Sequence, residues 1–217
     1  MMLTRLVLML TVLLTTQLCA PTSEARATSA LGKVITRAAD SVLNLTHDGE
    51  TFCTAWSVNE QAGYWVSAGH CGVIALEYWQ KTGTPVRLNG SWAVVVYTDA
   101  YRDLAVFQAT SAPALRLASI PPMVGDPIRV IGYPYGLIRT ETRGWVAALD
   151  LYVNVEAERS ELCDVLDVAI AGGNSGSPVL NKDGEVVGVV WGKIDQFALS
   201  VPWTSLQVVL TPYLPQR

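Results

Sequence analysis

A serine inside a glycine-rich turn is the part of this chain best suited to acyl chemistry. Residues 172–178 read Gly-Gly-Asn-Ser-Gly-Ser-Pro and place Ser175 between glycines. Glycines reach backbone angles that other residues avoid, and they let a substrate carbonyl approach the main chain closely. Such a turn can point several N–H groups at one oxygen, so Ser175 could be a nucleophile beside an oxyanion hole. Taken alone, the same segment is also typical of an ordinary loop.

A serine hydroxyl becomes a good nucleophile only when a neighbouring base takes its proton. The chain has only two histidines. His70 follows an apolar run that ends in a small-residue turn, whereas His47 lies in a Thr-His-Asp-Gly hairpin turn. A carboxylate must then fix the imidazole tautomer. Asp103 stands directly before the apolar run Leu-Ala-Val-Phe and is the better candidate. No apolar run follows Asp99 directly.

Three motifs occur in the order His, Asp, Ser: Ala-Gly-His-Cys at 68–71, Asp-Leu-Ala-Val at 103–106 and Gly-Asn-Ser-Gly-Ser-Pro at 173–178. In this order they resemble the chymotrypsin-like serine peptidases. Residues 132–137 and 167–170 are similar to the HtrA/Deg proteases, and residues 173–192 are equally similar to the glutamyl endopeptidases. The resemblance covers roughly residues 40 to 204.

The resemblance implies a serine endopeptidase that acts on protein or peptide substrates. In this reading His70 is the base, Asp103 orients it, and the N–H groups of Gly173 and Ser175 form the oxyanion hole. It also implies a disulfide between Cys53 and Cys71. Cys163 is left over and is expected to be a buried small side chain. No metal and no cofactor is expected, because the chain has neither a Cys-x-x-Cys motif nor paired histidines.

The resemblance also bears on the residue that precedes the cleaved bond. Ala169 stands where trypsin-like enzymes keep an aspartate, which argues against a preference for Lys or Arg. Val190 stands where glutamyl endopeptidases keep a histidine, which argues against an acidic preference. The expected pocket therefore favours small or medium apolar residues. Its expected lining is Ala169, Ile170, Ala171, Val190, Trp191 and Gly192.

Composition favours an all-β fold. The 217 residues include 17 glycines and 11 prolines, and short alternating apolar runs recur along the chain. These runs are 42–45, 51–58, 64–67, 92–97 and 104–108, then 128–131, 140–149, 152–156, 165–170, 178–180, 186–191 and 197–201. With the resemblance, they predict two six-stranded antiparallel Greek-key barrels, at 28–115 and 116–217. Residues 111–122 are the expected linker, and 204–214 have the spacing of a short closing helix.

The first residues are typical of a secretory signal. Arg5 precedes the apolar run 6–14, which is too short to cross a bilayer as a helix. We expect removal of residues 1–27, no stable membrane span afterwards, and a secreted or periplasmic protein. Lipid attachment at Cys19 and an uncleaved anchor are the alternatives.

The net charge of −4 and the lack of a basic cluster argue against nucleic-acid binding. The sequence does not indicate an oligomeric state. One alternative function stays open: a catalytically silent, peptidase-like binding module, because a sequence contains catalytic residue types but not their geometry.

Overall fold

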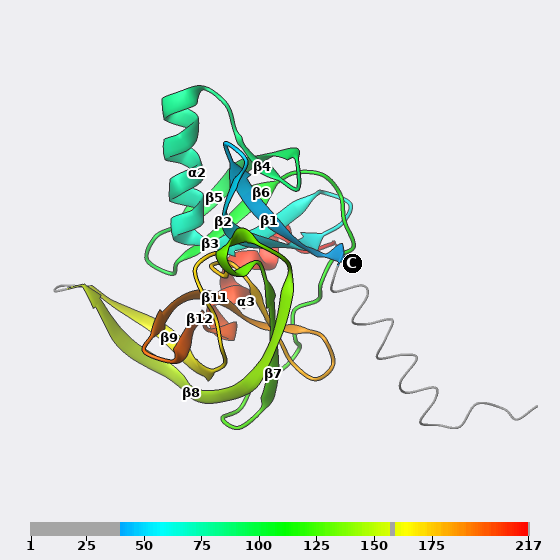
Figure 1. Ribbon diagram of the computed structural model, residues 1–217. Coiled ribbons are helices and arrows are strands. Elements are labelled where there is room, and N and C mark those ends of the chain that lie inside the picture. Colours follow the sequence, from blue (N-terminus) through cyan, green and yellow to red (C-terminus); the bar gives the residue numbers. More distant parts are fainter. Residues whose placement is uncertain (1–39, 157–158, 217) are drawn as a thin grey trace, which may run out of the picture.

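Two closed antiparallel β-barrels lie one above the other (Figure 1). The computed structural model describes residues 40–156 and 159–216. The first barrel has the strand order β1-β2-β3-β6-β5-β4 and the second β10-β11-β12-β9-β8-β7. The expected all-β class with two six-stranded antiparallel barrels is therefore confirmed.

The strands of the first barrel are β1 (Val42–His47), β2 (Glu50–Asn59), β3 (Tyr64–Ala68), β4 (Val86–Leu88), β5 (Ser91–Asp99) and β6 (Leu104–Gln108). Those of the second are β7 (Pro127–Gly132), β8 (Thr140–Glu156), β9 (Arg159–Asp167), β10 (Pro178–Leu180), β11 (Val186–Ile194) and β12 (Phe197–Val201). The expected linker, residues 111–122, contains no named strand and makes one isolated bridge, from Leu117 to Val186.

Local turn chemistry sets the register of two hairpins. Asp48 and Gly49 both have positive φ, 50° and 83°, as a two-residue hairpin turn requires. They join β1 to β2 with His47 opposite Glu50. In the turn after β10, the Asn181 side-chain oxygen accepts hydrogen bonds from the N–H groups of Asp183 and Glu185. The first of these turns was expected from the sequence, where His47 stands in a Thr-His-Asp-Gly hairpin turn.

Helix α2 (Gly69–Thr82) is an element that the sequence analysis did not predict. It ends at Gly83, whose φ is 72° and whose N–H donates to Trp79 O at 2.8 Å. Its first turns pack closely on β5 and β6, since a Cβ on Gly72 would lie 2.8 Å from Thr98 Oγ1. The helix therefore begins against the first barrel, with His70 in its first turn.

Strand β8 corrects two sequence expectations. The runs 140–149 and 152–156 belong to one strand of 17 residues, Thr140–Glu156. Asp150 takes a φ of 54°, and the register with β9 shifts between Ala148 and Leu151, so a bulge stands where a strand end was expected. Its partner β9 is also displaced from the expected 165–170. Acidic residues such as Asp164 interrupt the apolar alternation in its first half, so the sequence pattern does not indicate a strand there.

A shared apolar cluster joins the barrels. It contains side chains of the first barrel, of the second barrel and of the C-terminal helix α3 (Trp203–Leu210). Its members include Val42, Trp56, Val66, Leu104, Leu180, Val189, Val201, Leu206 and Leu210. A second cluster fills the first barrel and a third fills the second barrel. The expected closing helix is thus present, followed by the short turn η2 (Thr211–Tyr213).

Within the described residues, no helix is both long and apolar enough to cross a membrane. The expected signal segment, residues 1–27, lies outside the described residues.

Asp164 of β9 is a buried carboxyl, 4% exposed, that accepts a hydrogen bond from Asp150 N at 3.0 Å. Burial raises its pKa from 3.8 to about 6, and the nearby charge of Asp150 acts in the same direction. The folded protein therefore holds this proton at a pH where the unfolded chain has lost it. The protonated Asp164 therefore contributes to the free energy of unfolding in full below about pH 4, and this contribution is lost as the pH rises through 6.

We expect Asp164→Asn to remove this loss. The free energy of unfolding of the variant, measured relative to that of the wild type, should be on the order of 2–3 kcal/mol higher at pH 7 than at pH 4. Urea unfolding at both pH values measures the difference, with Asp167→Asn on the same strand as an exposed control. An equal offset between the variant and the wild type at pH 4 and pH 7 would contradict the titration of Asp164.

Candidate active site

His70 and Asp103 meet at the edge of the first barrel. The His70 side chain is 42% exposed, and the Asp103 side chain is 6% exposed. His70 Nδ1 lies 2.9 Å from Asp103 Oδ2 and 3.2 Å from Oδ1, and His70 N donates to Oδ1 at 2.6 Å. Because a carboxylate oxygen accepts, this contact favours the proton on Nδ1 and leaves Nε2 available as a base.

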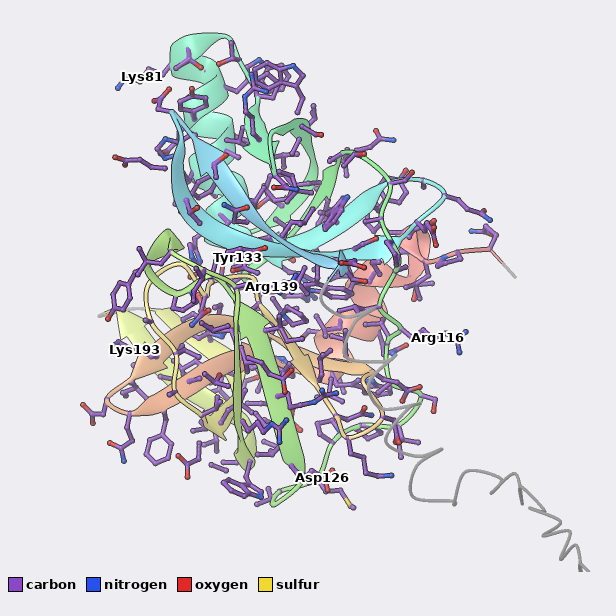
Figure 2. The ribbon with its side chains drawn as sticks, turned by 45° about the vertical axis from the view of Figure 1, so that its right-hand side comes forward. Lys81, Arg116, Asp126, Tyr133, Arg139 and Lys193 are labelled. Carbon is purple, nitrogen blue, oxygen red and sulfur yellow. A yellow bond between two sulfur atoms is a disulfide. The ribbon has the colours of Figure 1, made fainter. Side chains whose placement is uncertain are left out.

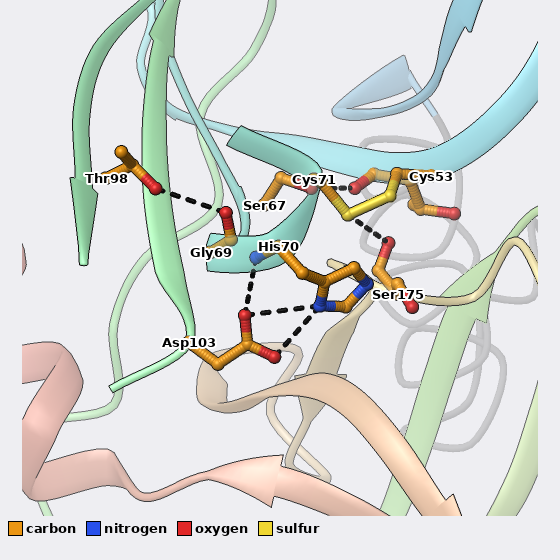
Figure 3. Close-up of polar contacts among 9 residues, drawn as sticks. Cys53, Ser67, Gly69, His70, Cys71, Thr98, Asp103 and Ser175 are labelled. Atoms are coloured by element: carbon orange, nitrogen blue, oxygen red, sulfur yellow. Dashed lines mark hydrogen bonds and ion pairs between the residues drawn. A yellow bond between two sulfur atoms is a disulfide. The ribbon is translucent and has the colours of Figure 1, made fainter. Parts of the chain in front are cut away.

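Close backbone packing brings these two residues together. A Cβ on Gly69 would come within 2.6 Å of Asp99 O and 2.8 Å of Asp103 C, so only glycine fits between β3 and α2. Thr98 Oγ1 donates to Gly69 O at 3.1 Å (Figure 3). Asp103 itself has a φ of 47°, an angle that Asp tolerates better than most residues. The α2 N-terminus is thus fixed against the loop that carries Asp103.

Asp99, the weaker candidate for the acid, has a different environment. Its Oδ1 accepts from the N–H groups of Tyr101 and Arg102, and its Oδ2 lies 2.8 Å from Arg102 Nη1. Burial raises the pKa of this carboxyl, but the hydrogen bonds from Arg102, Tyr97 and Tyr101 outweigh it, so the net pKa is lowered. Asp99 therefore organises the loop before β6, while Asp103 is the acid that contacts His70.

Ser175 lies on the loop between β9 and β10, across the His70 ring from Asp103 (Figure 3). Ser175 O accepts from Thr54 N of β2 at 2.8 Å and lies 3.9 Å from Cys71 Sγ. At Gly176 the φ is +87°, and a Cβ would collide with Thr54 O and Ser67 Oγ. The loop of the second barrel is therefore seated directly on β2 and β3 of the first.

Gly173 also needs to be glycine. Its φ is +92°, and a Cβ there would collide with Tyr133 O. Within the described part of the chain, neither Gly173 N nor Ser175 N donates to a protein acceptor. Two such N–H groups on one turn are the donors that an oxyanion hole requires.

Two flanking peptides of this loop are anchored from outside it. Gly172 O accepts from Tyr135 N at 2.6 Å, in the short turn η1 (Pro134–Gly136). Gly173 O accepts from the Thr54 hydroxyl at 2.8 Å. In the sequence, residues 132–137 show only a family likeness, and no motif points to Thr54. The one available signal was a hydroxyl residue next to Cys53.

The cysteines follow the expected pattern. Cys53 and Cys71 form a disulfide, and Cys163 is free and buried. Burial raises the pKa of the Cys163 thiol to about 11, and the charge of Asp164 acts in the same direction. The sulfurs of Cys53 and Cys71 lie with a His70 ring nitrogen within 4.8 Å. Because the disulfide occupies both sulfurs, this donor set does not fit a metal ion.

The residues expected to form the specificity pocket are not equally accessible. Ala169 is exposed, while Ile170, Ala171, Trp191 and Gly192 are partly buried. Val190 is only 1% exposed and belongs to the apolar cluster inside the second barrel. Trp191 packs against the clusters of both the barrel interface and the first barrel. The assignment of these residues to a pocket stays a prediction.

His47 is absent from this site. Its ring stacks on Tyr78 with centroids 5.1 Å apart, and it lies at the end of the β1–β2 hairpin. It therefore serves packing at the hairpin, as its position in a turn indicated.

Known proteases resemble this chain in both sequence and fold. A family model described as the trypsin-like peptidase domain matches residues 53–189. The serine protease HtrA-like of Staphylococcus aureus strain USA300 is 29% identical over an alignment of 134 residues, and the match covers 54% of this chain and 17% of the relative. The corresponding protein of strain bovine RF122 / ET3-1 gives the same values. The chain thus spans 17% of the length of these curated relatives.

Two solved structures share the fold. The active form of the Rv3671c protease from M. tuberculosis has a TM-score of 0.68 at 20% identity, covering 88% of both chains. The inactive form has a TM-score of 0.67 at 19% identity, covering 85% of this chain and 94% of that one.

We expect removal of the disulfide by Cys53→Ala with Cys71→Ala to lower the free energy of unfolding by about 2–4 kcal/mol, because it closes a loop in the unfolded chain. Denaturant unfolding measures the loss. Cys163→Ala is the control, because it removes a buried sulfur but no cross-link and should cost less. Equal losses in the two variants, or peptide maps that join Cys163 to either partner, would contradict this account.

Proposed function

Because the chain belongs to the family of trypsin-like peptidase domains, we propose that it is a serine endopeptidase whose catalytic residues are His70, Asp103 and Ser175. One observation carries the proposal. The His70 ring has its Nδ1 on a buried carboxylate and lies beside a serine whose own N–H, with that of Gly173, has no acceptor within the described residues. These contacts support the proposal that a base, a nucleophile and two oxyanion donors surround one position.

The proposed reaction proceeds through an acyl-enzyme. Ser175 Oγ attacks the carbonyl carbon of the peptide bond, and His70 Nε2 takes the hydroxyl proton. The oxygen that becomes negative is held by the N–H groups of Gly173 and Ser175, each worth about 3–4 kcal/mol in comparable enzymes. His70 then donates its proton to the leaving amine, and the C–N bond breaks. Water, activated by the same ring, releases the acid product and restores Ser175.

Asp103 acts on the ring rather than on the substrate. Its carboxylate holds the Nδ1 proton and stabilises the imidazolium that forms when Nε2 is protonated. The burial of Asp103 strengthens this contact, because the side chain is 6% exposed and water screens it little. The proposed chemistry requires no metal and no organic cofactor.

We propose protein or peptide substrates with a small or medium apolar residue before the cleaved bond. The support is the chemistry of Ala169, Ile170, Ala171 and the segment 190–192, which offers no charged side chain. A charged residue without a partner would pay a desolvation cost of several kcal/mol in an apolar pocket. The fine preference among apolar residues should be slight.

We propose export to the exterior or the periplasm after removal of residues 1–27, with barrels at 28–115 and 116–217. The Cys53–Cys71 disulfide supports this, because disulfides persist in oxidising compartments.

Replacing Ser175 with Ala should abolish hydrolysis of a casein or peptide substrate, with a loss on the order of a million-fold in kcat and an unchanged thermal unfolding curve. His70→Ala should cause similar damage. Asp103→Asn should lower kcat by about ten-thousand-fold because it favours the wrong tautomer. Asp99→Asn is the matched control and should be mild. Near-normal turnover in Ser175→Ala, or a greater loss in Asp99→Asn than in Asp103→Asn, would overturn the assignment.

A peptide library digested by the wild type and read by mass spectrometry should show cleavage after Ala, Val and similar residues. Cleavage after Lys, Arg, Asp or Glu should be rare, since the proposed pocket offers no counter-charge. Dominant cleavage after a charged residue would mean that other side chains line the pocket, with Asp167, Lys193 and Asp195 the first to replace.

A further inference from the structure

We propose that Thr54 is a positioning residue, whose side-chain hydroxyl holds the oxyanion turn of residues 172–175 in its competent conformation. The inference deepens the proposed peptidase function and rests on it. Thr54 belongs to β2 of the first barrel, whereas the turn that it contacts belongs to the second. It is fully buried, with 0% of its surface exposed.

The direction of the hydrogen bonds at the Thr54 hydroxyl is determined. Tyr133 N lies 3.1 Å from Thr54 Oγ1, and a backbone N–H can only donate. The oxygen of Thr54 is therefore the acceptor of that bond, and its own proton is free for Gly173 O at 2.8 Å. The result is a relay from Tyr133 N–H through the Thr54 hydroxyl to the carbonyl of Gly173. Figure 2 shows Tyr133 at the level where the two barrels meet.

The relay fixes one of the two peptide planes that flank Gly173. Tyr135 N, which donates to Gly172 O at 2.6 Å, fixes the other. In a trans peptide the C=O and the N–H point in opposite directions. Because Gly172 O is held on the η1 side, Gly173 N–H points away from η1. The Thr54 backbone adds a third anchor, since its N–H donates to Ser175 O at 2.8 Å.

A glycine needs this restraint more than other residues. Gly173 populates positive and negative φ almost equally in a free chain, so its peptide planes can rotate at low cost. Without the Thr54 hydroxyl, Tyr133 N–H and Gly173 O would both lack a partner in a part-buried contact. A loss of this kind costs about 1–3 kcal/mol for each unsatisfied group, and rotation of the turn would relieve it. That rotation would misdirect the oxyanion donors.

The test compares three variants of β2. Thr54→Val keeps the shape and removes the hydroxyl, and Thr54→Ser restores the hydroxyl without the methyl group. Ser57→Ala is the matched control, because Ser57 is equally buried on the same strand and its hydroxyl donates to Ala112 O at 2.9 Å. Removal of one oxyanion donor lowers kcat about 100- to 1,000-fold. Misdirecting the donors in Thr54→Val should lower kcat about 10- to 100-fold, with KM within about threefold of the wild type.

Thr54→Ser should recover kcat to within about threefold of the wild type, and Ser57→Ala should leave it unchanged within about twofold. A kcat for Thr54→Val within about twofold of the wild type would overturn the proposal. So would a Thr54→Ser variant as slow as Thr54→Val, because the effect would then come from packing of the methyl group. If Thr54→Val does not fold, Thr54→Ala takes its place with the same expected values.

A second measurement separates this proposal from the proposed function. The backbone amide signal of Gly173 in a ¹⁵N-labelled protein should shift or broaden in Thr54→Val but match the wild type in Thr54→Ser and Ser57→Ala. An inactive wild type with this amide pattern would refute the peptidase and support the role of Thr54. An unperturbed Gly173 amide in Thr54→Val would refute the role of Thr54, whether or not the wild type is active.

Discussion

The apolar contact between the two barrels is the interaction on which the rest of the structure depends. His70 and Asp103 belong to the first barrel and Ser175 to the second, so the proposed catalytic site can form only while the barrels are docked. Polar links across the interface, such as Thr54 N–H to Ser175 O and the Tyr133 hydroxyl to Val42 O, contribute about 1 kcal/mol each. Fully buried side chains such as Trp56 and Leu210 contribute about 1.5–3 kcal/mol each. Burial therefore holds the barrels together, and the hydrogen bonds set their alignment.

Alignment matters because the turn that carries Ser175 has little structure of its own. Glycines at 173 and 176 give it its shape and also make it easy to deform. Its neighbours supply the rigidity: β2 through Thr54, and η1 through Tyr135 N. Preorganised donors cost no rearrangement when charge develops on the substrate oxygen. In the proposed mechanism, the restraint on the turn is thus part of the chemistry as well as part of the fold.

The predictable parts of this protein were those that depend on residue type at one position. Ser175, His70 and Gly173 stand in short motifs that the sequence displays directly, and the apolar runs together with the family resemblance predicted the two barrels, although no run covered β4. Helix α2 was missed, because its anchors are tertiary contacts such as Gly72 against Thr98. The contacts of the Thr54 hydroxyl could not be predicted for the same reason, since its partners lie 79 and 119 residues away in the chain. The bulge at Asp150 likewise interrupts the apolar alternation of β8, and in the sequence this interruption resembles the end of a strand.

The central claim is that Ser175 is an activated nucleophile and not merely a residue of a folded binding module. A fluorophosphonate probe forms a covalent bond only with such a serine, and peptide mapping by mass spectrometry identifies the modified residue. The account predicts stoichiometric labelling of the wild type at Ser175, and none in the Ser175→Ala or His70→Ala variants. A folded wild type that stays unlabelled, or one labelled at Ser177 instead, would contradict it.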